Sequence, residues 1–148
     1  MAWQEPKTDW NCYYTSSGKY TGDYFNVADY DRIRGNFQVL WNLAAEVLPS
    51  IAEGSEGLPD FPTITAESFV TPGSLNVFER SIDVLLPFVQ PYYTVQTKTW
   101  AAQQAAPGYG DWNRIESAQL NIYNILVQQA AARGVLAVTL ADILGGEI

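Results

Sequence analysis

One short pattern, which occurs twice, constrains the fold of this chain more than any other feature. Asp29-Tyr30-Asp31-Arg32-Ile33 and Asp111-Trp112-Asn113-Arg114-Ile115 each place an acid, an aromatic residue, Asp or Asn, and then Arg-Ile. On a helix, residues three apart share a face, so the acid and the arginine of each copy can contact one another. Acidic residues are also favoured in the first turn of a helix. The pattern therefore predicts two helices that begin in the same way.

Apolar residues follow each copy at steps of three and four, which is the period of an amphipathic helix. Three stretches show this period and are predicted to be helical: residues 27–48, 71–90 and 111–133. Asn26 is a suitable N-cap for the first. Pro49 ends the first and Pro91 stops the second, because proline supplies no backbone N–H. Pro87 is a second candidate for the end of the second helix or for a kink in it. Gly134 is the predicted C-cap of the third.

Two other stretches have the composition of strands. Tyr92–Trp100 is β-branched and aromatic with partial alternation, and Val135–Leu140 is short and β-branched. We expect residues 93–99 to pair with the second stretch. The predicted fold class is therefore mainly α: a small bundle of three main helices with an extended aromatic N-terminal arm and a short two-stranded β element.

The chain is predicted to divide into an arm, a helical domain and a tail. These are residues 1–24, residues 25–144 with a Gly- and Pro-rich linker at 49–70, and a loose tail at 145–148. Turn-forming residues break any helix in the arm. The arm's aromatic residues either pack on the domain or form an interface with a neighbouring subunit. The candidate interface residues are Trp3, Trp10, Tyr13 and Tyr14.

Composition argues against several classes of function. The chain has 148 residues and a net charge of −8, which disfavours binding to nucleic acid and to anionic membrane surfaces. No apolar run approaches the roughly 20 residues needed to span a bilayer, and the N-terminus does not have the pattern of a signal peptide. Cys12 is the single cysteine, and there is no histidine. The usual general base and the usual metal ligand are therefore missing.

The sequence carries no motif that points to catalysis. It has no phosphate-binding glycine loop, no paired cysteines and no nucleophile elbow. We therefore expect no enzymatic activity, no cofactor and no metal. Asp29 with Arg32, and Asp111 with Arg114, are predicted to be structural clamps that fix the two helix starts. The alternative is a paired polar site for a small ligand or an ion.

Several motifs, taken in order, resemble a known group of proteins. They are Trp3-Gln-Glu-Pro-Lys-Thr-Asp-Trp10, Asp23-Tyr-Phe-Asn26 before the first copy of the pattern, Leu75-Asn-Val-Phe-Glu79 and Asn113-Arg-Ile-Glu116. This order resembles small proteins encoded in the structural gene clusters of phages and prophages of Firmicutes. Asn76-Val-Phe-Glu-Arg80 also resembles the two helix starts, without the full pattern.

The resemblance implies a non-enzymatic virion component of the tail, baseplate or fibre region, made in the bacterial host cytoplasm. Its partners would be other virion proteins, and it would form a symmetric homo-oligomer. Two alternatives remain open: a carbohydrate-binding module of the tail that recognises the host surface, and a head decoration or neck protein.

Overall fold

The structure, a computed structural model, describes residues 2–11, 15–19, 22–64, 71–102 and 107–143, with the last ten described as backbone only. The structure is 58% helical, and no strand occurs among the described residues. The elements are α1 (Val27–Val47), α2 (Pro49–Glu53), α3 (Pro72–Leu85), the 3-10 helix η1 (Leu86–Phe88) and α4 (Tyr109–Ile143). The prediction of a mainly α fold is confirmed.

Local chemistry explains where α1 and α3 begin. The Asn26 side chain accepts a hydrogen bond from the Asp29 N–H at 3.1 Å, and the Asp29 carboxylate accepts one from the Asn26 N–H at 3.0 Å. Thr71 and Ser74 form the same reciprocal capping box at the start of α3. Helix α1 ends at Val47, and Pro49 starts α2 at a first position that suits proline.

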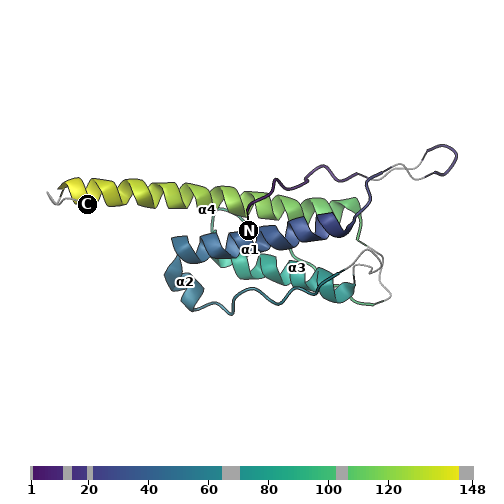
Figure 1. The fold of residues 1–148 in the computed structure, drawn as a ribbon, viewed down its shortest axis with the longest axis horizontal. Helices are drawn as coiled ribbons and strands as arrows, with labels where there is room; N and C mark the ends of the chain where they lie inside the picture. The colour runs from purple at the N-terminus through teal and green to yellow at the C-terminus, as the bar shows by residue number, and fades with distance from the viewer. Residues whose placement is uncertain (1, 12–14, 20–21, 65–70, 103–106, 144–148) are drawn as a thin grey trace.

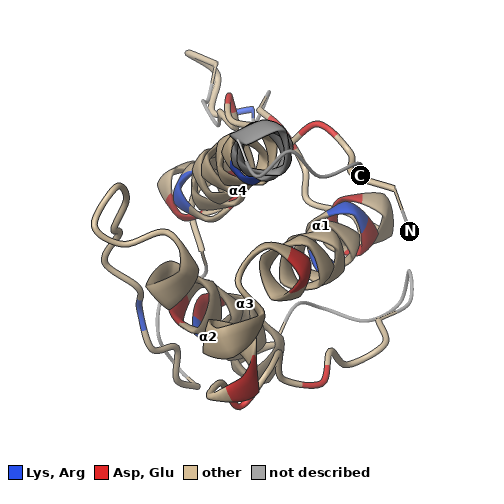
Figure 2. Cartoon of the chain, turned by 90° about the vertical axis from the view of Figure 1, so that its left-hand side faces the viewer, with Lys and Arg blue, Asp and Glu red and all other residues tan. Residues whose placement is uncertain are grey.

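The three long helices pack around one core. Figure 2 shows α1, α3 and α4 at the corners of a triangle, with α2 near α3. Residues 2–11 are extended and hydrogen-bond to both α1 and α4. Fully buried apolar side chains include Tyr30, Ile33, Phe37 and Leu40 of α1, Phe78, Ile82 and Leu85 of α3, and Ile115, Ile122 and Leu126 of α4.

Two sequence predictions about the C-terminal half are wrong. Helix α4 does not end at Arg133 with Gly134 as its cap, but continues to Ile143. Val135–Leu140 is therefore helical and forms no strand with residues 93–99. β-Branched residues favour strands only where a sheet offers a partner, and a glycine inside a helix costs only about 1 kcal/mol. Residues 93–100 are extended, but they bond to helix side chains instead of to a strand.

The linker prediction also needs a correction, because residues 49–53 form α2. Pro49 ends α1, as expected, and at the same time supplies the first residue of this short helix. The predicted tail at 145–148 lies outside the described residues.

We predict that Asn26→Ala lowers the free energy of unfolding by about 1 kcal/mol, because it removes the acceptor for the Asp29 N–H. The control is Asn124→Ala, an exposed position inside α4 where alanine is the better helix former. Urea denaturation followed by circular dichroism measures both. Equal losses in the two variants would contradict this account of the start of α1.

Candidate functional site

The most unusual feature of the interior is a pair of buried glutamates. Glu116 of α4 is 0% exposed and Glu79 of α3 is 2% exposed. A buried carboxylate is costly unless it is paired and hydrogen-bonded. Each of the two meets an arginine from a neighbouring helix and an extended segment of the chain. We call these groups the Arg32–Glu116 clamp and the Arg114–Glu79 clamp.

The Arg32–Glu116 clamp joins α1 to α4. Arg32 Nε lies 2.8 Å from Glu116 Oε1, and Arg32 Nη2 lies 2.9 Å from Glu116 Oε2. This is a two-point contact, the strongest form of an arginine–carboxylate pair. The remaining guanidinium nitrogen, Nη1, lies 2.8 Å from Asp29 Oδ1. The predicted Asp29 and Arg32 are thus brought together, and the arginine also reaches a second acid.

The same glutamate holds the N-terminal arm. Glu116 accepts hydrogen bonds from the Lys7 N–H at 3.1 Å and from the indole N–H of Trp10. The Asn113 side chain then brackets the Trp10 backbone, accepting from its N–H at 2.7 Å and donating to its carbonyl at 2.9 Å. Asn36 brackets Gln4 in the same manner. The arm is therefore fixed to the bundle by polar contacts at defined points.

The Arg114–Glu79 clamp repeats this set of partners between α4 and α3, with the arginine meeting the carboxylate through its two Nη atoms. Arg114 Nη1 lies 2.8 Å from Glu79 Oε2, Nη2 bonds to Oε1, and Asp111 Oδ1 is 3.6 Å from Nη2. Glu79 accepts from the Lys98 N–H and from the Trp100 indole N–H, each at 3.2 Å.

An asparagine again brackets the tryptophan of the second clamp. Asn76 accepts from the Trp100 N–H at 2.7 Å and donates to its carbonyl at 2.8 Å. In both segments a lysine ammonium lies over the tryptophan ring, at 5.3 Å for Lys7 and 5.7 Å for Lys98. The two clamps therefore match in their lysine, tryptophan, asparagine, glutamate and arginine.

The sequence also contains a signal for the extended segments and the glutamates of the two clamps. The helix-start pattern does not include these residues. Lys7-Thr-Asp-Trp10 and Lys98-Thr-Trp100 are the two extended segments, and each lies against a helix that carries Asn and, three residues later, Glu. Asn76 and Glu79 occupy the same positions in α3 as Asn113 and Glu116 in α4. Glu79 and Glu116 were not among the predicted site residues, because a glutamate in a helix is usually exposed.

The neighbouring acids favour the charged form of the two clamp arginines. Burial lowers the pKa of Arg32, but hydrogen bonds to Glu116 and Asp29 outweigh it and the pKa is raised overall. Hydrogen bonds to Glu79 raise the pKa of Arg114 against the effect of burial. Both guanidinium groups are therefore held in their charged form. Groups that do not change their protonation state are suited to holding segments in place, and not to proton transfer.

The predicted interface residues contact their own bundle where the structure describes them. Trp10 is 4% exposed and belongs to the core. Trp3 stacks on Tyr123 of α4 with ring centroids 4.0 Å apart. Tyr13 and Tyr14 lie outside the described residues. Whether a second subunit also contacts the arm stays a prediction.

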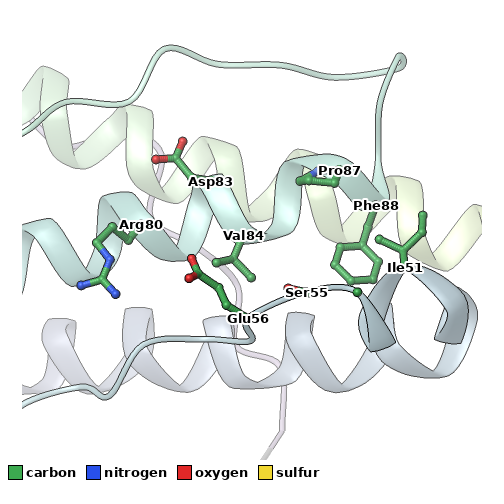
Figure 3. A pocket seen from close by; sticks show the side chains of 9 residues that line it. Ile51, Ser55, Glu56, Arg80, Asp83, Val84, Pro87 and Phe88 are labelled. Carbon is green, nitrogen blue, oxygen red and sulfur yellow. The ribbon is translucent and has the colours of Figure 1, made fainter.

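A surface pocket of about 350 Å³ lies between α2, the loop that follows it, α3 and η1. Figure 3 shows apolar side chains along it, including Val84 and Phe88, with Glu56 and Arg80 beside them. The third charged residue, Asp83, accepts a hydrogen bond from the Thr97 hydroxyl at 2.9 Å. The mixture of apolar surface and both signs of charge indicates no particular ligand or reaction.

Two further searches cover the described part of the chain. No group of three or more acidic or thiol side chains there could hold a metal ion. No helix there is long and apolar enough to cross a membrane.

The chain was compared with protein families, curated proteins and solved structures. No protein family, curated protein or solved structure matches this chain.

We predict that Glu116→Gln lowers the free energy of unfolding by about 3 kcal/mol or more, because it leaves the Arg32 charge largely buried without its main counter-charge. Glu46→Gln, an exposed position on α1, is the matched control and changes stability little. Chemical denaturation measures both. If Arg32 and Glu116 form one unit, the double variant R32Q/E116Q loses less than the sum of the single variants. Additive losses would show that the two side chains are independent.

A pH dependence follows from Asp111. Burial raises its pKa, but hydrogen bonds from Lys98 and from the Gly108 N–H, with the charges of Lys98 and Arg114, outweigh burial and lower it below 3.8. A lowered pKa in the folded state contributes stability above the unfolded value, and this is lost as pH falls through the folded pKa.

Asp111→Asn is therefore expected to be less stable than the wild type at neutral pH. The difference shrinks as pH falls below the ordinary value of 3.8. Urea denaturation across a pH series measures the difference. Asp60→Asn, at an exposed loop position, is the control and shows no comparable change. A difference between wild type and D111N that stays constant through this range would contradict the role of the carboxylate charge.

Proposed function

We propose that the protein is a non-enzymatic structural component of a bacteriophage particle, acting in the assembly of the tail, baseplate or fibre region. The observation that carries this proposal is the use of its buried charges. Glu79 and Glu116 are both fully engaged in holding extended segments against helices. An assembly protein needs surfaces held in fixed positions, and the two clamps supply such positions. The order of motifs along the chain supports the same class.

The geometry favours the structural clamp over a paired ligand site. Each arginine of the repeated pattern already has two acidic partners: Asp29 and Glu116 for Arg32, and Asp111 and Glu79 for Arg114. All three guanidinium nitrogens of Arg32, and both Nη atoms of Arg114, donate to these carboxylates. A small anion would have to displace a buried carboxylate to bind there.

The carbohydrate-binding alternative has less support. A saccharide platform requires an aromatic ring with one open face, and Trp10 is buried with its indole N–H bonded to Glu116. Trp3 already stacks on Tyr123. Among the described aromatic residues of the arm, Tyr24 is the most exposed, at 70%. No specific observation favours the neck or head location over the tail.

We predict that purified phage particles of the host strain contain this protein in a fixed ratio to other virion proteins. Mass spectrometry of gradient-purified particles measures that ratio, and antibody labelling in electron microscopy gives the position. Interruption of the gene by a stop codon is expected to give incomplete particles, with complementation by the intact gene as the control. Complete, infective particles that lack the protein would overturn the proposal.

A further inference from the structure

The buried stripe of α4 continues in the sequence beyond the part that the bundle covers. Ile115, Ile122 and Leu126 are fully buried against α1 and α3. The stripe, at alternating steps of four and three, consists of Ile115, Gln119, Ile122, Leu126, Gln129, Arg133, Leu136, Leu140 and Ile143. This alternation is the heptad spacing of helices that pair along a common seam. After Leu126 the seam continues for about two and a half heptads.

The corresponding part of α4 extends past its neighbours. Figure 1 shows the C-terminal turns of α4 running beyond the ends of α1 and α3, with no other described element beside them. A helix in water gains most of its stability from packing. Gly134 lies within this stretch and costs about 1 kcal/mol relative to alanine. A partner along the seam would supply the packing that the chain itself does not.

Apolar surface is also present at the base of the extension. Tyr92 is 76% exposed. It lines a shallow pocket of about 280 Å³ together with Ile125, Gln128, Gln129 and Ala132. The base therefore offers a hollow next to an exposed aromatic ring. An apolar helix end that reaches this point has a surface to pack against.

The charge distribution along the extension is compatible with a second copy of this chain as the occupant. The whole chain carries a net charge of −8, so two copies repel each other over most of their surfaces. From Val127 to Ile143 the only charged residues are Arg133 and Asp142, and this stretch has no net charge. An antiparallel pair centred on residue 138 places Leu136 opposite Leu140 of the other copy. In the same pair, Asp142 of each copy lies opposite residue 134 of the other copy. Asp142 is therefore next to the oppositely charged Arg133 of that copy.

We propose that the C-terminal half of α4 is a dimer interface, on which a second copy of this chain packs antiparallel along the Leu136–Leu140–Ile143 seam. In this register Ile143 of each copy lies level with Arg133 of the other, one residue from Ala132 at the edge of the hollow. Such a contact is isologous, the commonest arrangement in homo-oligomers. The inference goes beyond the proposed function, because it concerns the purified chain alone and holds whether or not the protein is found in particles.

The mass of the purified full-length chain in solution tests the interface. Light scattering after size exclusion is expected to give twice the chain mass of 16.4 kDa. The double variant L136E/L140E halves the measured mass, because it places charges on the seam. Ala131→Glu, an exposed position on α4 away from the seam, is the matched control and stays dimeric. Thermal unfolding of the variants checks that the bundle core remains folded.

Three results would overturn the interface. The first is a wild-type protein at the single-chain mass, which would leave the seam to a different partner. The second is a L136E/L140E variant that folds and stays dimeric. The third is an equal loss of the dimer in A131E. Particles that lack the protein would overturn the proposed function and leave this measured mass unchanged.

Disulfide trapping tests the orientation of the pair. In a Cys12→Ser background, chains with Leu136→Cys are mixed with chains of different length that carry Leu140→Cys. Oxidation is expected to give the mixed covalent dimer in preference to either dimer of identical chains. A parallel pair would instead join Leu136→Cys chains to one another, and that result would overturn the antiparallel arrangement.

Discussion

The structure depends on the neutralisation of one fully buried carboxylate. Glu116 is 0% exposed, and each of its oxygens accepts from Arg32 and from the N-terminal arm. A carboxylate in this position cannot lose a partner without leaving a charge in the interior, which costs several kcal/mol. Helix α1, helix α4 and the arm are therefore held together through a single side chain. The polar contacts fix their relative positions, while the apolar core supplies the general driving force for their packing.

The second clamp shows that the repeated unit is larger than a helix start. The unit consists of an extended segment that begins with Lys-Thr and ends with Trp, the helix on which this segment lies, and an arginine from a third element. In one case the helix is α4 and the arginine comes from α1. In the other the helix is α3 and the arginine, Arg114, comes from α4. Helix α4 therefore supplies the glutamate of one clamp and the arginine of the other, and it couples the two.

The sequence predicted the helices well because their starts carry local signals. Asn26 with Asp29, and Pro72 after Thr71, act within one turn and need no tertiary information. The prediction failed where the outcome depends on distant partners. Nothing near Glu79 or Glu116 in the sequence indicates that an arginine from another helix will lie beside it. Val135–Leu140 was misassigned for a related reason, since its β-branched residues are compatible with a helix that continues from a well-packed core.

The position of α4 in both clamps also bears on the dimer interface proposed for its C-terminal half. The part from Asp111 to Leu126 is fixed on one side by Arg114 and Glu116 and on the other by the core. Its direction is therefore set by buried contacts that do not involve the extension. A helix fixed in this way presents its remaining turns at a defined angle, so a partner does not need to order them relative to the bundle. The two clamps thus reduce the entropic cost of any assembly that uses the end of α4.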